Sequence, residues 1–307
     1  MNTLSTAKKV QIINCLVEGM SLRATSRITD VSINTVTKLL VDTGKACQNF
    51  HDENVHSLTT KRVQLDEIWS FVYAKESHVE DIVNSDIDKD KAGDVWTWVG
   101  IDADTKLVMS WYVGDRDAVS ANAIVSDIKS RLTNRVQLTT DGLKTYIDAV
   151  KNSFGKNIDF AMLQKIYESD NPKGAKRYEQ NKRKNQNERR YSPGDFTGIE
   201  IKTISGKPNP DHISTSYVER QNLTMRMHMR RFTRLTNAFS KKIENHCYAI
   251  ALHFVYYNFV KIHTTLRVTP VMQAGLIKNL MSIEDLVNLH ITEAPKTRGE
   301  YKKRISN

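Results

Sequence analysis

Three acidic side chains stand out by their places in the expected secondary-structure elements: within a strand, at the end of a strand and in the first turn of a helix. Asp66 lies in the β-branched and aromatic stretch "VQLDEIWSFVY", and Asp141 follows the short stretch "VQLTT". Glu219 lies in the first turn of a predicted helix. Converging carboxylates repel one another unless a cation neutralises them, and oxygen ligands of this kind suit Mg²⁺ or Mn²⁺. Two such ions about 4 Å apart can activate a water or a 3′-OH in phosphoryl transfer.

Each of these acids also has an ordinary explanation. Asp66 is next to Glu67, and strand alternation places the two on opposite faces, so we expect only one of them, Asp66, to be a ligand. Asp141 precedes a glycine and fits a turn or a cap. Glu219 fits a capping box with Ser216, because Ser-x-x-Glu is that pattern. The metal hypothesis therefore depends on the three acids occurring together in the right order of elements.

The middle of the chain predicts a sheet that could bring these acids together. The periodicity predicts two helices, at 120–132 and 143–154. It predicts strands at 63–73, 94–102, 106–114, 136–140 and 159–163. The order β-β-β-α-β-α-β is typical of an α/β fold with a mixed sheet flanked by helices. The first and fourth strands can then lie side by side, with the helix of Glu219 packed across them.

The N-terminal residues predict a helix-turn-helix. Residues 6–44 read as three short helices with tight connections, the third of them closed by Gly44. In this layout the third helix enters the major groove of DNA. Its leading polar residues are Asn34, Thr35, Thr37 and Lys38. The alternative is a plain three-helix bundle without a nucleic-acid partner.

Charge is unevenly distributed along the chain. The net charge is +10, but residues 60–154 carry 12 basic and 16 acidic side chains, whereas residues 155–307 carry 27 basic and 14 acidic ones. The first 59 residues are almost neutral. An acidic middle followed by a basic C-terminal half suits a polyanion held beside a cation-binding carboxylate site.

The stretch "TSYVERQNLTMRMHMRRFTRLTNAFSKK" concentrates this basic charge. After Glu219 it holds seven Lys or Arg residues and no further acid. A solvated helix usually interleaves its charges, because like charges at helical spacing repel one another. The pattern therefore favours an anion bound along this stretch.

The segment 168–210 is polar, basic and poor in aliphatic residues, so we expect an inserted loop there. The expected domains are a helix-turn-helix at 1–45, a linker at 46–62 and a catalytic domain at 63–275 that contains the insertion. A C-terminal helix and a basic tail are expected at 276–307.

Composition excludes several protein classes. The 307 residues are 39% hydrophobic, with a mean hydropathy of −0.48, and hold no apolar run near the roughly 20 residues of a membrane span. No signal peptide is recognised at the N-terminus. Three scattered cysteines form no CxxC pair, which argues against a disulfide framework or a zinc ribbon. We expect a cytoplasmic, nucleoid-associated protein.

With these motifs in view, the chain from about 63 to 275 resembles the transposases of bacterial insertion sequences in the DDE superfamily. The motifs that carry the resemblance are "QLDEIWSF", "TTDGLKTY" and "STSYVERQNLTMRMHMRRFTRLTNAFSKK". The resemblance implies a ribonuclease-H-like core with Asp66, Asp141 and Glu219 as the ligands of two Mg²⁺ or Mn²⁺ ions. Many such enzymes carry a basic residue seven positions after the Glu, which here is Arg226.

The resemblance also implies contacts to DNA phosphates from the other arginines of the third motif, since arginine forks pair phosphate oxygens two at a time. These are Arg220, Arg230, Arg231 and Arg234. His263 in "NFVKIHTTL" matches a recurrent ending of such domains, although helix-end capping explains it equally well. The cysteine cluster that begins some related transposases is absent from this sequence, so end recognition would depend on the helix-turn-helix.

The implied activity is DNA transposition. Such an enzyme binds the terminal inverted repeats, cuts a strand with metal-activated water and joins the freed 3′-OH to target DNA. Its expected partners are double-stranded DNA and further copies of itself, with no organic cofactor and no membrane. Three alternatives remain at this point: a helix-turn-helix regulator on an inactive core, a metal-dependent nuclease without strand joining, and a structural scaffold.

Overall fold

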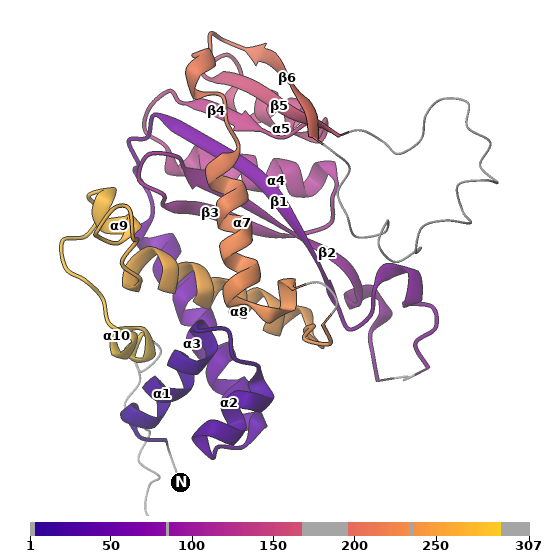
Figure 1. Ribbon diagram of the computed structural model, residues 1–307, viewed down its shortest axis with the longest axis vertical. Coiled ribbons are helices and arrows are strands. Elements are labelled where there is room, and N and C mark those ends of the chain that lie inside the picture. The colour runs from indigo at the N-terminus through magenta and orange to yellow at the C-terminus, as the bar shows by residue number, and fades with distance from the viewer. Residues whose placement is uncertain (1–3, 84–85, 168–195, 234–235, 290–307) are drawn as a thin grey trace, which may run out of the picture. The chain divides into compact units, whose positions relative to one another are not determined.

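The computed structural model describes residues 4–83, 86–167, 196–233 and 236–289 (Figure 1). The chain divides into two compact units. One unit combines Met1–Asn54 with Met227–Asn307, and the other is Val55–Arg226. This division differs from the expected domains, because the residues after Arg226 group with the N-terminal helices and not with the sheet.

The unit Val55–Arg226 is built on a six-stranded mixed sheet in the order β3-β2-β1-β4-β5-β6. Strand β1 pairs antiparallel with β2 and parallel with β4, while β5 pairs parallel with β4 and antiparallel with β6. The strands are β1 (Arg62–Val72), β2 (Gly93–Asp102), β3 (Val108–Gly114), β4 (Gln137–Thr140), β5 (Asp159–Tyr167) and β6 (Phe196–Ser205).

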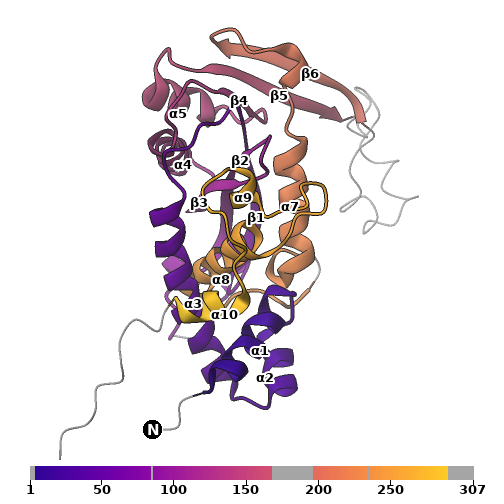
Figure 2. The same cartoon turned by 90° about the vertical axis from the view of Figure 1, so that its left-hand side faces the viewer.

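Helices cover both faces of this sheet. Helices α4 (Ala118–Arg131) and α5 (Thr145–Phe154) lie on one face, and α7 (Ser216–His228) crosses the other (Figures 1 and 2). The fold class predicted from the sequence is confirmed: an α/β fold with a mixed sheet flanked by helices. It is consistent with the ribonuclease-H-like core that the resemblance implied.

Apolar side chains from the sheet and from α5 form the core beneath the first of these faces. Trp98 and Tyr146 are fully buried, and their rings meet edge to face with centroids 5.4 Å apart. Fully burying a large apolar side chain contributes about 1.5–3 kcal/mol, so this layer fixes α5 on the sheet. The hydroxyl group of Tyr146 binds a side chain of β1.

Strand β6 corrects the prediction of a loop over 168–210. Residues Phe196–Ser205 pair with β5 along its whole length, from Tyr167↔Phe196 to Phe160↔Ser205. Their sequence "FTGIEIKTIS" alternates β-branched residues with others, which is a strand pattern. The rest of the predicted insertion, 168–195, lies outside the described residues.

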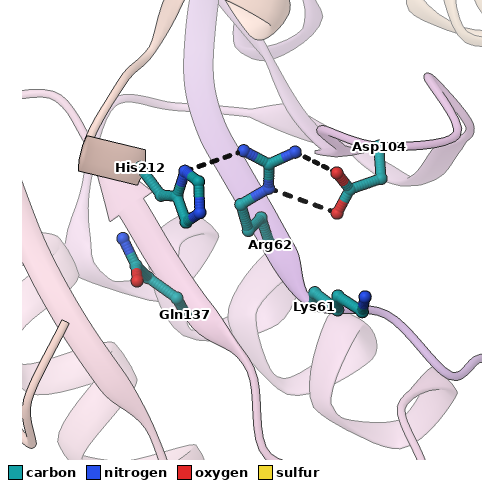
Figure 3. Close-up of a pocket in the computed structure, with 5 residues that line it drawn as sticks. All are labelled: Lys61, Arg62, Asp104, Gln137 and His212. Atoms are coloured by element: carbon teal, nitrogen blue, oxygen red, sulfur yellow. Dashed lines mark hydrogen bonds and ion pairs between the residues drawn. The ribbon is translucent and has the colours of Figure 1, made fainter. Parts of the chain in front are cut away.

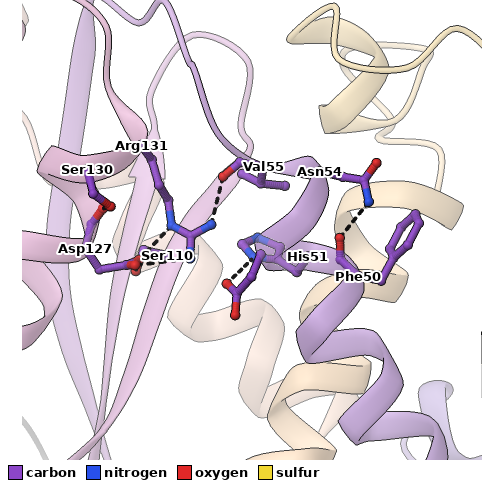
Figure 4. A network of polar contacts seen from close by, with 9 residues as sticks. Phe50, His51, Asn54, Val55, Ser110, Asp127, Ser130 and Arg131 are labelled. Atoms are coloured by element: carbon purple, nitrogen blue, oxygen red, sulfur yellow. Dashed lines mark hydrogen bonds and ion pairs between the residues drawn. The ribbon is translucent and has the colours of Figure 1, made fainter.

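A polar network ties α4 to the sheet and to the start of the unit (Figure 4). Asp127 of α4 accepts from Arg131 Nε at 2.7 Å and from the hydroxyl of Ser110 on β3. Arg131 Nη1 donates to the carbonyl of Val55 at 2.7 Å. Asp127 is thus bonded both to Arg131 of its own helix and to Ser110 of β3, and this holds α4 at a fixed position on β3.

The other unit is helical. Its helices are α1 (Thr6–Val17), α2 (Leu22–Thr29), α3 (Ile33–Asn54), α8 (Ile243–Val255), α9 (Pro270–Gln273) and α10 (Ile283–Asn288). Ser5 and Ser21 cap α1 and α2 through their hydroxyl oxygens, as expected from their types. Asp30, with a φ of 51°, forms the tight turn from α2 towards α3.

Helix α3 is longer than the sequence predicted. It does not end at Gly44 but continues to Asn54, so most of the predicted linker 46–62 is helical. The glycine serves close packing instead: a Cβ at Gly44 would lie 2.3 Å from the carbonyl oxygen of Tyr248 on α8. Gly44 is therefore the point where α3 and α8 approach each other backbone to backbone.

Shorter elements complete the description. They are η1 (Glu76–His78), η2 (Lys89–Lys91), η4 (Pro210–His212), η5 (Arg230–Phe232) and the π-helix η6 (Tyr256–Val260). Of the C-terminal helix and basic tail expected at 276–307, residues 290–307 lie outside the described residues. Within the described ranges, every helix is too short or too polar to cross a bilayer.

Candidate active site

The strand register places Asp66 and Asp141 at the same level of the sheet. In the parallel pair β1 and β4, Leu65 is the partner of Thr140. Asp66 follows Leu65 on β1, and Asp141 directly follows Thr140, the last residue of β4, so the two acids lie at the same level of neighbouring parallel strands. Carboxylate oxygens of Asp66, Glu67 and Asp141 all lie within 4.8 Å of one another.

Gln64 brings the helix of Glu219 to this place. Its Oε1 accepts the backbone N–H groups of Tyr217 at 2.8 Å and Val218 at 3.1 Å, both in the first turn of α7. The first N–H groups of a helix have no partner within the helix, so Gln64 of strand β1 acts as an N-terminal cap for α7. Gln64 and Asp66 share one face of β1, which sets α7 beside Asp66.

The carboxylate of Glu219 binds side chains and does not form the capping box considered from the sequence. Its Oε1 accepts from the hydroxyl of Thr215 at 2.6 Å, and its Oε2 forms an ion pair with Lys165 of β5. Ser216 is already the first residue of α7, and its N–H donates to the hydroxyl of Ser214. The bonds found on Ser216 and Glu219 thus leave that box unformed.

Further contacts attach the segment before α7 to strands β1 and β4. Arg62 of β1 forms a fork on Asp104 and donates through Nη1 to Nδ1 of His212 at 3.1 Å (Figure 3). The side-chain amide of Gln137 on β4 donates through Nε2 to the carbonyl of Asn209 and accepts the N–H of Asn209 at Oε1. These contacts border a cavity of about 350 Å³ lined by Lys61, Arg62, Asp104, Gln137 and His212.

Asp66 is the most strongly perturbed acid of the site. Burial, together with repulsion from Glu67, Asp141 and Glu219, raises its pKa to about 8. Its Oδ2 accepts from Asn222 Nδ2 of α7 at 2.8 Å. Glu219 also contributes to the raised pKa of Asp141, which is caused first by burial. Glu219 therefore lies close enough to act electrostatically on both Asp66 and Asp141.

Glu67 departs from the expectation based on strand alternation. Its side chain turns to the α5 face, where its Oε2 accepts from Tyr146 Oη at 3.0 Å, yet its carboxylate still reaches the cluster. Arg116 binds Glu67 Oε1 through Nε at 2.7 Å and lies 3.9 Å from Asp141 Oδ2. Burial raises the pKa of Glu67, and Arg116 opposes that shift. Glu67 thus belongs to the cluster with its charge already paired.

Sequence reasoning missed four polar residues of this site: Gln64, Arg116, Lys165 and Asn222. Two of them carried a signal. Asn222 is three residues after Glu219 and shares its helix face. Gln64 similarly shares a strand face with Asp66. Arg116 and Lys165 had no such signal, since their contacts depend on the packing of separate elements.

The predicted phosphate-binding arginines have different surroundings. Arg220 and Arg226 on α7 and Arg230 in η5 are exposed. Arg231 donates through Nη1 to the hydroxyl of Ser240 at 2.8 Å and to the carbonyl of Asn245 at 3.1 Å, and burial lowers its pKa to about 10. Those contacts make Arg231 a packing residue near the start of α8. Arg234 lies outside the described residues.

The predicted DNA-reading residues begin α3. Asn34, Thr35 and Lys38 are exposed, and Lys38 pairs with Asp42 at 2.7 Å. Thr37 is half-buried and donates to the carbonyl of Ile33 at 2.8 Å, so its hydroxyl is already bonded within the helix.

His263 has a role in a turn. Its Nδ1 accepts the N–H of Thr265 at 3.3 Å, its N–H donates to Val268, and its carbonyl accepts from Arg267. These bonds join His263 to the residues that follow it and do not cap a helix end, so both explanations of His263 stay predictions.

No protein-family model and no curated protein matches the sequence. Among solved structures, the chain is similar to a piggyBac transposase synaptic complex with hairpin DNA, with 10% identity and a TM-score of 0.42 over 95% of this chain and 73% of that one. It is also similar to the Mos1 strand transfer complex, with 12% identity and a TM-score of 0.22 over 83% and 76%. Because both similarities are weak, the chemistry of the site is inferred from its own residues.

Proposed function

We propose that this chain is a transposase that cuts and joins DNA strands with divalent metal ions. The observation that carries the proposal is the cluster of Asp66, Glu67 and Asp141, whose carboxylate oxygens lie within 4.8 Å of one another. Glu219 is outside that group, but its helix begins beside the same strand, so we propose Asp66, Asp141 and Glu219 as the ligands. Two of them leave neighbouring parallel strands at one level, and Gln64 holds the helix of the third against the same strand.

The residues present fit a divalent cation. The donors are carboxylates, which suit Mg²⁺ and Mn²⁺. A metal-free Asp66 is protonated at neutral pH, because its pKa lies at about 8, and a nearby cation would favour the ionised form. The Oδ1 atom of Asn222, on the residue that contacts Asp66, is buried without a partner among the described residues. An acceptor of this kind is expected where an ion or its water is missing.

Asp66, Asp141 and Glu219 would hold the metal. Metal bound there supplies Lewis-acid activation of a water or a 3′-OH and neutralises charge on the leaving oxygen. The water oxygen would form a bond to phosphorus as the P–O3′ bond breaks, leaving a 3′-OH and a 5′-phosphate. In joining, that 3′-OH would attack a target phosphodiester and release its 3′ oxygen.

The remaining residues position this set. Asn222 holds Asp66 Oδ2, and Arg116 neutralises Glu67 so that it adds little net charge to the cluster. The exposed Arg220, Arg226 and Arg230 are proposed to contact DNA phosphates. Asn34, Thr35 and Lys38 are proposed to read the terminal repeats through the major groove.

The test is cleavage and strand joining on a labelled duplex that carries the terminal repeat of the element. Wild type and Glu219→Gln, which keeps size and removes charge, are compared in Mg²⁺, Mn²⁺ and EDTA. Because even outer-shell changes cost about 10–100-fold at metal sites, we expect a larger loss for Glu219→Gln, with DNA binding retained. Cleavage without joining would indicate a nuclease, and repeat binding without cleavage in either metal would indicate a regulator.

A further inference from the structure

Two basic side chains form direct ion pairs with two of the four acids of the site, which are Asp66, Glu67, Asp141 and Glu219. Arg116 pairs with Glu67, and Lys165 pairs with Glu219. Asp66 accepts from an amide and Asp141 from the backbone N–H of Leu143. A metal ion entering between Asp66 and Asp141 meets only a distant ion pair, because Arg116 Nη2 lies 3.9 Å from Asp141 Oδ2, whereas Glu219 holds Lys165 in a direct ion pair.

Lys165 is placed by the sheet and not by chance mobility of a surface side chain. It lies on β5, in the ladder opposite Ile199 of β6, three residues past Met162, the partner of the last residue of β4. The strand thus extends past the end of β4, where the acids gather. The side chains of Lys165 and Glu219 are 34% and 38% exposed, so water and ions can reach the pair.

We propose that Lys165 is an exchangeable internal cation that neutralises Glu219 in the metal-free protein and competes with metal for that carboxylate. This inference rests on the proposed function. An ammonium ion is a compact point charge on a flexible stem, so its displacement needs only rotation of side-chain bonds. Once displaced from Glu219, it is available to a phosphate oxygen of bound DNA.

This exchange couples metal binding to DNA binding. A phosphate that draws Lys165 away removes the competitor from Glu219, so DNA raises the affinity for metal. By linkage, metal then raises the affinity for DNA by the same factor. Without the ammonium, metal affinity in the absence of DNA increases and the coupling through this residue disappears.

The test is a titration of the full chain with Mn²⁺, with free Mn²⁺ followed by electron paramagnetic resonance, with and without a duplex of unrelated sequence. Lys165→Met should bind Mn²⁺ about two- to fivefold more tightly than wild type without DNA, the size of a partly exposed ion pair. DNA should raise Mn²⁺ affinity in wild type and raise it less in Lys165→Met. Lys165→Arg keeps a cation and should behave as wild type, which separates loss of charge from misfolding.

Lys202→Met is the matched control, because Lys202 pairs with Glu200 at 3.1 Å on the surface of β6 and touches none of the acids. It should leave both affinities unchanged. Equal Mn²⁺ affinity and equal coupling in wild type and Lys165→Met would overturn the role of Lys165 alone. Absence of Mn²⁺ binding to every variant would overturn the metal site itself, and with it the proposed function.

Discussion

Asn222 Nδ2 donates a hydrogen bond of 2.8 Å to Asp66 Oδ2, and this contact joins helix α7 to the strand that carries Asp66, whose pKa burial raises to about 8. Asn222 lies three residues after Glu219 on the same helix. One helix therefore supplies both a carboxylate of the site and the amide that orients its neighbour.

The raised pKa of Asp66 predicts that the metal-free protein loses stability as the pH rises. Its pKa is about 8 in the folded protein against an ordinary 3.8. Between these values the folded protein holds a proton that the unfolded chain has released, so the free energy of unfolding falls by up to about 1.4 kcal/mol per pH unit. Urea unfolding in EDTA from pH 5 to pH 8 should show this slope in wild type.

Asp66→Asn provides the comparison for this prediction. The amide cannot titrate, so the variant should lose less stability with pH and should be the more stable protein at pH 8 in EDTA. Addition of Mn²⁺ should stabilise wild type more at pH 8 than at pH 5, since metal binding displaces the proton. Parallel pH curves for the two proteins would contradict the assignment.

Gln64 should control both stability and cleavage. Gln64→Leu leaves the N–H groups of Tyr217 and Val218 without their acceptor, which costs about 1–3 kcal/mol for an unsatisfied buried group. Helix α7 should loosen, and cleavage should fall because Glu219 moves with it. Gln64→Glu keeps the acceptor oxygen and should retain more stability in urea unfolding. If the Gln64→Leu and Gln64→Glu proteins proved equally stable, Gln64 would not be the cap that we describe.

The close approach of α3 and α8 predicts a large effect for a single methyl group. Gly44→Ala would place a Cβ 2.3 Å from the carbonyl oxygen of Tyr248, so we expect a loss of about 1–3 kcal/mol in the free energy of unfolding. Gly198→Ala is the control, since a Cβ there meets nothing within 4 Å. A Gly44→Ala protein as stable as the control would mean that the two helices do not pack this closely.

The start of α3 should carry sequence discrimination. Asn34→Ala should cost about 1–3 kcal/mol in binding to the terminal repeat and little on an unrelated duplex, as expected for a base contact. Lys38→Ala should weaken both and lower the salt slope by about one. Fluorescence anisotropy measures all of these. Asn14→Ala, at an exposed position of α1, is the matched control, and if it weakened binding as much as Asn34→Ala, α3 would not be the reading helix.

The sequence predicted the sheet well because its signals are local. Strand alternation and helical periodicity located β1 to β5, α4 and α5 to within a few residues. The element order was enough to expect β1 beside β4, and the observed register then sets Asp66 level with Asp141. Glu219 was identified through its motif, and its position depends on Gln64, whose face of β1 the alternation indicates but whose bonds to α7 depend on packing.

Features that depend on packing between distant segments were not predictable. Gly44 resembled a helix end because glycine usually favours one, but here the absence of a side chain admits Tyr248. Strand β6 was hidden by the basic composition of the segment before it. Arg231 belonged to a basic motif by sequence, yet its partners Ser240 and Asn245 follow it in the chain and meet it only in the fold.

The central claim, that these acids hold the catalytic metal, is tested most directly by changing one ligand atom. Asp141→Cys replaces a hard oxygen with a softer sulfur, which Mg²⁺ accepts poorly and Mn²⁺ accepts better. Strand cleavage of the terminal-repeat duplex is measured for wild type and Asp141→Cys in each metal. We predict that the variant is inactive in Mg²⁺ and partly restored in Mn²⁺, while Asp141→Ala stays inactive in both. Cleavage by Asp141→Cys at the wild-type rate in Mg²⁺ would contradict the account.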